Sequence, residues 1–231
     1  MTDDMIDGLV DRYGAEAMCT ALEPMLSPAR IARIDVVLAA RLGSVVPVLE
    51  DTYDAHNAAA TIRTIEAIGL QDLHVVELAH PFVAVHAISR GAHDWIDLHR
   101  HASADAAVAA LHARGFRVLA TAPDAPNDLE SVDVSTPVAV MFGNEHAGLS
   151  DAAMRAADAA IAVPMHGMTE SFNLSVTVAL VTSRLAARRR AHLGVTGDLD
   201  PARIARLRAR WFGARVRGLA GVLERVMPAG A

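Results

Sequence analysis

Short apolar runs alternate with longer stretches of helical periodicity along most of the chain, and this pattern constrains the fold more than any other feature. The runs are five to seven residues long and rich in Val, Leu and Ala; they occupy positions 45–50, 73–78, 116–121, 137–143 and 160–164. Strands that are apolar throughout are buried on both faces, and intervening helices provide that cover. The alternation therefore predicts an α/β fold with a mostly parallel sheet and helices on both of its faces.

Helical segments are expected between the runs and at both ends of the chain. Ser27 is an expected N-cap, with Pro28 at the first helical position and Gly43 at the end of that helix. Further helices are expected over 54–69, 104–115, 150–158, Ser171 to about Arg190, and 200–226. The predicted organisation is an N-terminal helical extension over 1–42, a catalytic domain over 43–190 and an Arg-rich C-terminal helical extension over 191–231.

The composition excludes several classes of protein. The single cysteine, Cys19, excludes an intrachain disulfide framework and suits a reducing compartment. No apolar run approaches the roughly 18–20 uncharged residues of a membrane span, and the acidic N-terminus does not resemble a signal peptide. A cytoplasmic protein without a membrane partner is expected.

The charge is distributed unevenly. The formal net charge is −6, yet all 21 basic residues are arginine, and eleven of them lie between Arg184 and Arg225 against three carboxylates. An acidic body with a basic tail suggests that a polyanion is held at one end. By itself the pattern is more typical of Arg-rich helices with solvated faces.

The loops that follow the strands are where a parallel sheet binds ligands. Ser171 and Ser175 lack the G-x-S-x-G turn of a serine hydrolase, so they are interpreted as a helix N-cap and an inward-facing helix residue. The histidines around "HDWIDLHRH" lack metal-ligand spacing, so no metal is expected. In "FGNEHAGLS", Gly143 and Gly148 flank a loop that could present backbone amides to a ligand or form a tight strand-to-helix turn.

Three stretches taken together, and in this order, resemble the three motifs of the SpoU/TrmH family. They are "DAHNAAATIRTIEAIG", "PVAVMFGNEHAGLS" and "IAVPMHGMTESFNLSVTVAL"; "ISRGAHDWIDLHRH" resembles a further Gly- and Trp-containing segment of the family. The resemblance covers residues 30–190 and implies an S-adenosylmethionine-dependent RNA 2′-O-ribose methyltransferase of the SPOUT superfamily. It also implies a deep trefoil knot and a homodimer that completes each site. The short helical extensions are similar to those of TrmH-type enzymes, which modify a guanosine in the tRNA D-loop.

The resemblance assigns roles to individual residues. The catalytic set is Arg63, Asn57, Glu145, Ser171 and Asn173. The donor-binding positions are Thr121, Gly143, Val163, Met165 and Phe172. The arginines expected to grip RNA phosphates are Arg30, Arg33, Arg41, Arg188, Arg189, Arg190, Arg206 and Arg210.

A free guanidinium is a very poor base, so Arg63 is expected to orient an RNA phosphate and stabilise the developing alkoxide. Asn57 lies six residues earlier, about 240° around the helix, and is expected to orient the neighbouring loop. Two departures from the family pattern bear on the substrate: Asp54-Ala55 before the first motif, and Glu170 before Ser171. A ribosomal RNA methyltransferase and a non-catalytic RNA-binding protein of the same fold are the alternatives.

Overall fold

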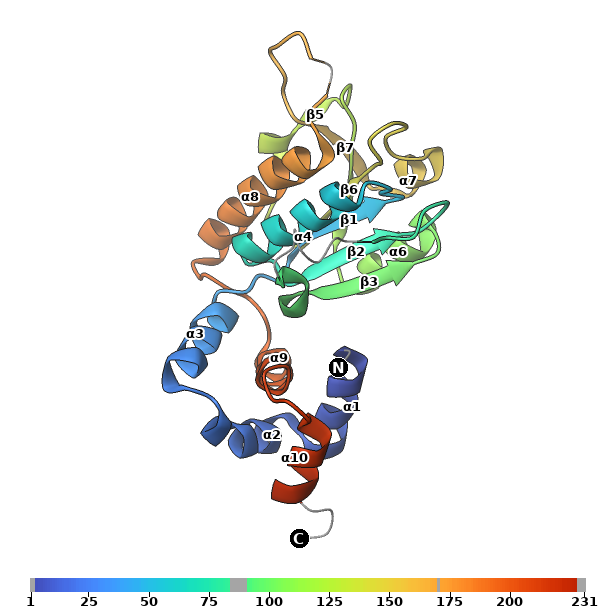
Figure 1. Cartoon of the computed structure of the whole chain (residues 1–231). Coiled ribbons are helices and arrows are strands. Elements are labelled where there is room, and N and C mark those ends of the chain that lie inside the picture. Colours follow the sequence, from blue (N-terminus) through green and yellow to red (C-terminus); the bar gives the residue numbers. More distant parts are fainter. Residues whose placement is uncertain (1–2, 84–90, 170, 228–231) are drawn as a thin grey trace. The chain divides into compact units, whose positions relative to one another are not determined.

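The computed structural model describes residues 3–83, 91–169 and 171–227 (Figure 1). Its contacts divide the chain into two compact units. One unit is Leu42–Val195, and the other combines Met1–Arg41 with Thr196–Ala231. Glu170 and residues 88–90 of the Trp-containing segment lie outside the described residues.

A seven-stranded sheet forms the centre of the unit Leu42–Val195. The strand order is β3-β2-β1-β6-β4-β7-β5, and every neighbouring pair is parallel. The strands are β1 (Val45–Glu50), β2 (Asp72–Val76), β3 (Asp97–His101), β4 (Arg117–Thr121), β5 (Asn127–Asp128), β6 (Val138–Phe142) and β7 (Ala159–Ala162). The expected parallel α/β architecture is confirmed, and two strands, β3 and β5, were not expected.

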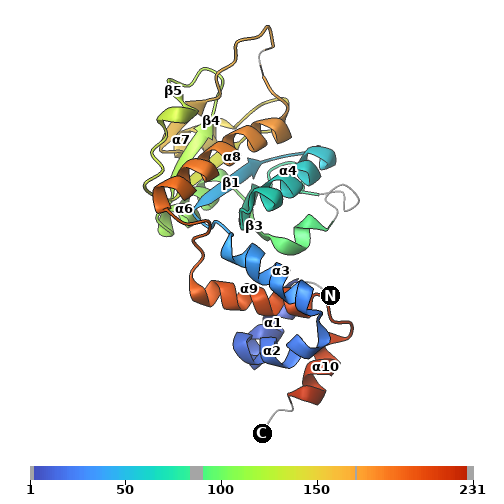
Figure 2. The same cartoon turned by 90° about the vertical axis from the view of Figure 1, so that its left-hand side faces the viewer.

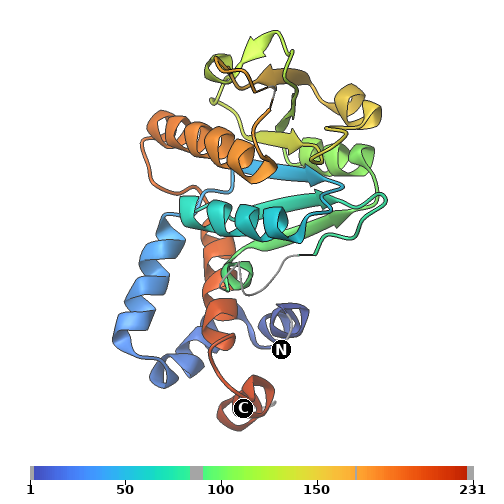
Figure 3. The ribbon, with the colours of Figure 1, turned by 45° about the horizontal axis from the view of Figure 1, so that its top comes forward.

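Helices cover both faces of this sheet. α4 (Ala55–Ile68) and α8 (Leu174–Leu193) lie side by side on one face (Figure 3). α6 (Ala104–Ala113) and α7 (Asp151–Ala156) pack together on the other. Two short 3-10 helices, η2 (Ala92–Trp95) and η3 (Leu129–Ser131), complete the unit. Each face has its own apolar cluster, so the central strands are buried on both sides, as their continuous apolar runs predict.

Helix ends near the sheet follow from local hydrogen bonds. Asp54, one of the two departures from the family pattern, caps α4: its Oδ1 accepts from the His56 amide at 2.8 Å. The expected cap at Ser171 is wrong. Asn173 caps α8 instead, because its Oδ1 accepts both the amide and the hydroxyl of Ser175, at 2.9 and 2.7 Å.

The second unit is built from both ends of the chain (Figure 2). Its elements are α1 (Asp3–Tyr13), α2 (Ala15–Leu22), η1 (Glu23–Met25), α3 (Pro28–Ala39), α9 (Pro201–Gly213) and α10 (Leu219–Val226). Ser27 caps α3 as predicted, but α3 ends at Ala39 and not at Gly43. α9 contacts α1, α2 and α3, so the two terminal extensions form one helical body.

No helix among the described residues is long and apolar enough to cross a membrane.

Arginines of α8 fasten the segment that precedes β6. Arg188 donates to the carbonyls of Leu129 and Val132. The buried Arg189 donates to Ser44 Oγ at 2.9 Å and to the carbonyls of Val134 and Ser135 at 2.8 and 2.7 Å. Segment 129–135 is thereby attached to α8 by two adjacent arginines.

We predict that Arg189→Met lowers the free energy of unfolding of the chain by about 2–4 kcal/mol, because it removes the buried hydrogen bonds to two main-chain carbonyls and to Ser44 Oγ. Denaturant unfolding measures the change. Arg184→Met is the matched control on the same helix: Arg184 pairs with Glu130 at the solvent-exposed surface, and its loss should lower the free energy of unfolding far less. Equal losses for the two variants would contradict the prediction.

His74, a residue of β2, is a buried histidine whose ring meets His101 of β3. His74 is 2% exposed, its Nδ1 lies 2.9 Å from His101 Nε2, and its ring stacks on that of His101. Burial lowers the pKa of His74 to about 3, and the nearby His99 and His101 deepen the shift. The folded chain therefore keeps His74 neutral at pH values where the unfolded chain protonates it.

The stabilisation linked to His74 is complete above its unfolded pKa of about 6.5 and is lost as the pH falls from there toward 3. We predict that the free energy of unfolding of the wild-type chain falls between pH 7.5 and pH 5. In the His74→Gln variant the same free energy should fall less over this interval. Urea unfolding at both pH values tests this. An undiminished drop in the variant would exclude His74 as its source.

Candidate active site

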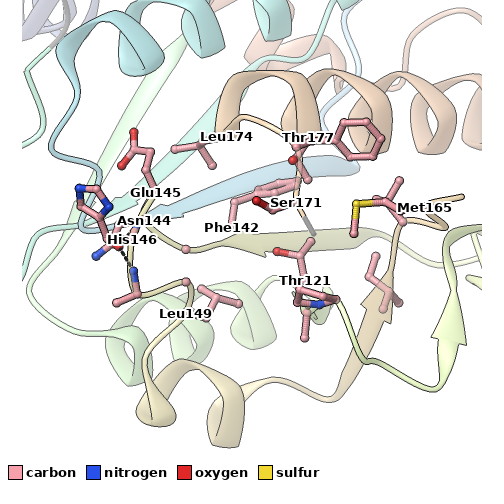
Figure 4. Close-up of a pocket in the computed structure, with 18 residues that line it drawn as sticks. Thr121, Phe142, Asn144, Glu145, His146, Leu149, Met165, Ser171, Leu174 and Thr177 are labelled. Carbon is pink, nitrogen blue, oxygen red and sulfur yellow. Dashed lines mark hydrogen bonds between the residues drawn. The ribbon is translucent and has the colours of Figure 1, made fainter. Parts of the chain in front are cut away.

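A cavity of about 380 Å³ opens at the carboxyl ends of β4, β6 and β7 (Figure 4). It is lined by residues of the loops after these strands and of the first turn of α8: Thr121, Ala122, Pro123, Phe142–Leu149, Ile161, Val163, Met165, Ser171, Phe172, Leu174 and Thr177. The lining mixes apolar side chains with a few polar groups, and its size is typical of a small-molecule site.

All five positions predicted to bind a donor line this one cavity: Thr121, Gly143, Val163, Met165 and Phe172. They come from three separate segments of the sequence, at or after the ends of β4, β6 and β7. The Thr121 hydroxyl is already engaged, since it donates to the Met141 carbonyl at 2.9 Å. Its contribution to the cavity is therefore shape, whereas the main-chain groups of the loops are the available polar surface.

Gly143 lets two parts of the loop after β6 come together. A Cβ at this position would lie 1.9 Å from the Gly148 carbonyl carbon and 2.1 Å from the Leu149 nitrogen. Asn144 and Gly148 exchange two main-chain hydrogen bonds of 3.1 Å, and the Asn144 side chain accepts from the amides of His146 and Ala147. The loop closes on itself into a tight ring that excludes a side chain at position 143.

Glu50 fixes the far end of this loop. The side chain of this last residue of β1 is 2% exposed. Its two oxygens accept from the Ser150 amide and hydroxyl at 2.7 and 2.8 Å. Ser150 is also the N-cap of α7.

A chain of hydrogen bonds joins three of the predicted catalytic residues. Asn57 Nδ2 donates to Glu145 Oε1 at 2.7 Å, and Asn173 Nδ2 donates to Asn57 Oδ1 at 3.0 Å. The other Glu145 oxygen, Oε2, is buried and has no partner among the described residues. The chain couples the start of α4, the loop after β6 and the start of α8.

The remaining two predicted catalytic residues are placed differently. Ser171 is exposed and lines the cavity. Arg63 lies on α4 with an exposed side chain and does not line the cavity. A single chain thus brings four of the five predicted residues to the cavity or its polar border.

The structure corrects part of the predicted arginine set. Arg41, Arg189 and Arg210 are only 0, 7 and 8% exposed, so their guanidinium groups do not face solvent. They are buried because folding surrounds them: Arg41 lies over the Trp211 ring, Arg210 pairs with Asp7, and Arg189 binds carbonyls. A buried guanidinium cannot grip a phosphate at the surface.

The other predicted arginines fall into two groups. Arg188 and Arg190 donate to main-chain carbonyls of their own unit, and Arg206 pairs with Asp7 and Asp11. Arg30 and Arg33, on α3, have exposed side chains. The two exposed arginines of α3 remain as candidates for contact with a polyanion.

Sequence reasoning missed several residues that shape the site. Glu50 carried a signal, as the single charged residue in the apolar run 45–50. Tyr53 and His146 carried none; they meet at the mouth of the cavity, where the Tyr53 hydroxyl lies 2.7 Å from His146 Nε2. Asp51 is also unforeseen: burial opposes its charge, but hydrogen bonds from His80, Ala79 and Leu78 lower its pKa overall.

We predict that Gly143→Ala lowers the free energy of unfolding by about 2 kcal/mol, because the new Cβ collides with backbone that has no room to move. Gly167→Ala is the matched control in the loop after β7: nothing lies nearer than 3.9 Å to its Cβ, and the change should stay within about 0.5 kcal/mol. Denaturant unfolding compares the two. If Gly143→Ala were as mild as Gly167→Ala, the closed ring would be wrong.

Comparisons with known proteins agree with one another. Residues 44–183 match the model of the SpoU rRNA Methylase family. The chain is 33% identical over 209 residues to the tRNA (guanosine(18)-2′-O)-methyltransferase of Borreliella burgdorferi, which covers 90% of this chain and 93% of that protein.

Two solved structures are similar. One is the TrmH/SpoU tRNA modifying enzyme of Aquifex aeolicus, with a TM-score of 0.74 and 26% identity, covering 81% of this chain and 97% of that one. The other is an AdoMet-bound rRNA methyltransferase of Sinorhizobium meliloti, with a TM-score of 0.57 and 28% identity, covering 67% and 58%.

Proposed function

We propose a function for this chain from its family, because it belongs to the SpoU rRNA methylase family. It is an S-adenosylmethionine-dependent RNA 2′-O-ribose methyltransferase that acts on a guanosine of the tRNA D-loop. One observation carries the proposal. The five expected donor positions line a single cavity, and the hydrogen-bond chain through Asn57, Glu145 and Asn173 borders it.

The residues present fit the donor. The cavity has the volume of a small-molecule site, and the tight ring that Gly143 permits places main-chain groups of the loop after β6 on its wall. Main-chain groups after β4, β6 and β7 would hold the nucleoside, with Met165 and Phe172 as apolar walls. When bound, S-adenosylmethionine supplies a methyl group already activated by its sulfonium.

The chain's own task is to align a ribose and help its 2′-hydroxyl lose a proton. The transfer would join the 2′-oxygen to the methyl carbon, with S-adenosylhomocysteine as the leaving group and the hydroxyl proton passing to water. Glu145 is held in one orientation by Asn57, and Ser171 faces the same space. Arg63 holds the RNA phosphate and stabilises the developing alkoxide, roles for which a bidentate guanidinium is suited.

We further propose a homodimer in which Arg63 of one subunit faces the donor cavity of the other. Two observations support it: Arg63 is exposed and absent from the cavity of its own chain, and Val176 and Leu180, four residues apart on α8, are 44 and 42% exposed. Apolar residues at this spacing form one stripe, which a second subunit would cover. A deep trefoil knot in the catalytic domain, residues 43–190, belongs to the same proposal.

A tRNA is favoured over ribosomal RNA by the relative from Borreliella burgdorferi, which matches along nearly its whole length and bears a tRNA-specific name. Within this proposal the helical extensions, residues 1–42 and 191–231, provide RNA contacts, with Arg30 and Arg33 the exposed arginines of α3. Ribosomal RNA is the second candidate, since the family's own description and the Sinorhizobium meliloti structure name it.

Methyl transfer from labelled S-adenosylmethionine tests the function. The purified chain should label total tRNA, and nuclease mapping should place the label on a D-loop guanosine ribose. Labelling of ribosomal RNA alone would reassign the substrate, and labelling of neither would refute the activity.

We predict that Arg63→Ala lowers transfer by at least about 100-fold, because alkoxide stabilisation is lost, while S-adenosylhomocysteine binding, measured by calorimetry, stays within about twofold. Co-expression with a donor-site variant such as Met165→Trp, whose larger side chain would fill the cavity, should then restore activity, because a mixed dimer holds one complete site. Full activity of Arg63→Ala would refute its role. No restoration in proven mixed dimers would refute the shared site.

A further inference from the structure

Three exposed aromatic rings gather beside the cavity mouth. Tyr53 follows β1, and its ring stacks on that of His146, with centroids 5.1 Å apart and planes at 15°. The ring of His80 lies 5.8 Å from that of Tyr53 on a tilted plane. Tyr53 is 43% exposed, and the side chain of His80 is 50% exposed. We call these three residues the aromatic platform.

Hydrogen bonds to Asp51 and Asn144 fix the positions of the histidine residues of the platform. Asp51 has a positive φ of 49°, a conformation that non-glycine residues seldom adopt. Its carboxylate binds the amides of residues 78, 79 and 80 and the Nδ1 of His80. His146 is fixed through its amide to Asn144 and through its ring to the Tyr53 hydroxyl. The rings therefore need little ordering when a ligand arrives.

The platform adjoins the residues expected to meet the ribose. His146 lines the cavity and directly follows Glu145, which binds Asn57 in the first turn of α4. Tyr53 directly precedes Asp54, the N-cap of the same helix. A nucleotide whose ribose enters beside Glu145 has its own base, or that of a neighbour, within one nucleotide of these rings.

The surroundings favour a base over a phosphate. The Asp51 carboxylate contacts the His80 ring, and Asp54 directly follows Tyr53 in the chain; both negative charges would repel a phosphate. A nucleobase is uncharged and stacks on aromatic side chains, which is how proteins commonly hold unpaired RNA bases. Chemistry on a ribose of a folded RNA also requires the local stack to open, which frees a base.

We propose that the aromatic platform of Tyr53, His80 and His146 stacks an unpaired base within one nucleotide of the methylated ribose, and so positions the RNA substrate. The inference rests on the proposed function for the identity of the RNA. Tyr53 is thus a positioning residue, whose ring acts on RNA binding and not on the donor.

A binding cycle between protein and RNA tests the proposal without methyl transfer. The probe is a fluorescently labelled tRNA transcript, either intact or with a single abasic nucleotide at the mapped methylation site or at either neighbour. Its dissociation constant is measured by anisotropy on the full chain with saturating S-adenosylhomocysteine. Tyr53→Ala should weaken binding of the intact transcript about tenfold, as expected for one lost base–aromatic stack.

At one of the three positions, the abasic transcript should bind wild type and Tyr53→Ala equally, because the stacking partner is already gone. Tyr53→Phe keeps the ring and should stay within about twofold of wild type, whereas Tyr53→Leu should resemble Tyr53→Ala. S-adenosylhomocysteine binding confirms that each variant is folded, and Tyr53→Leu carries the test if Tyr53→Ala does not fold.

An undiminished loss at all three abasic positions, or wild-type binding by Tyr53→Leu, would overturn the platform. Failure of the proposed function gives a different result, namely a wild-type chain that transfers no methyl group to RNA. The two ideas are therefore refuted by separate measurements.

Discussion

The hydrogen-bond chain Asn173–Asn57–Glu145 is the interaction on which the site depends. Asn57 lies 88 residues before Glu145 and 116 residues before Asn173 in the sequence. Each of the three residues lies where a helix begins or where a loop leaves a strand. A side-chain amide is suited to the central position, because Asn57 must donate to a carboxylate and accept from another amide at once. An ionised carboxylate at position 57 could accept from the Asn173 amide but could not donate to Glu145. An aliphatic residue could neither donate nor accept. The cavity thus has a border whose polar groups are oriented before any ligand enters.

The parallel sheet was predictable because its central strands are apolar on both faces. Short runs of this kind are typical of strands in a parallel sheet that helices cover on both sides. Edge strands lack that constraint. In β3 the residues Asp97–His101 alternate between exposed and half-buried, and β5 has two residues, so neither presents an apolar run. The donor positions came from a resemblance of motifs, which implies spatial proximity that no periodicity contains. Tyr53 and His146 could not be paired from sequence, because their contact spans 93 residues and depends on how two loops fold.

The arginines show a limit of charge counting. In the sequence, the C-terminal segment is strongly basic, and this charge suggested a bound polyanion as one of two interpretations. In the folded unit, Arg206 pairs with Asp7 and Asp11, and Arg208 pairs with Asp35, so much of that charge is met by the N-terminal helices. The two ends of the chain neutralise each other locally, whereas the net charge is unchanged. Surface potential follows from which charges remain unpaired after folding, and sequence composition does not record that.

The attachment of Arg189 to Ser44, Val134 and Ser135 also has a consequence for the order in which the chain is assembled. During synthesis from the N-terminus, Ser44 and the segment around residue 134 leave the ribosome well before Arg189 does. Their shared partner is absent until α8 emerges, and the first turn of the same helix supplies a wall of the cavity. These acceptors in the nascent sheet therefore lack their partner until Arg189 is made, more than fifty residues after Ser135. Contacts of such long sequence separation are slow to form, which makes the completion of α8 the natural late step in the maturation of this unit.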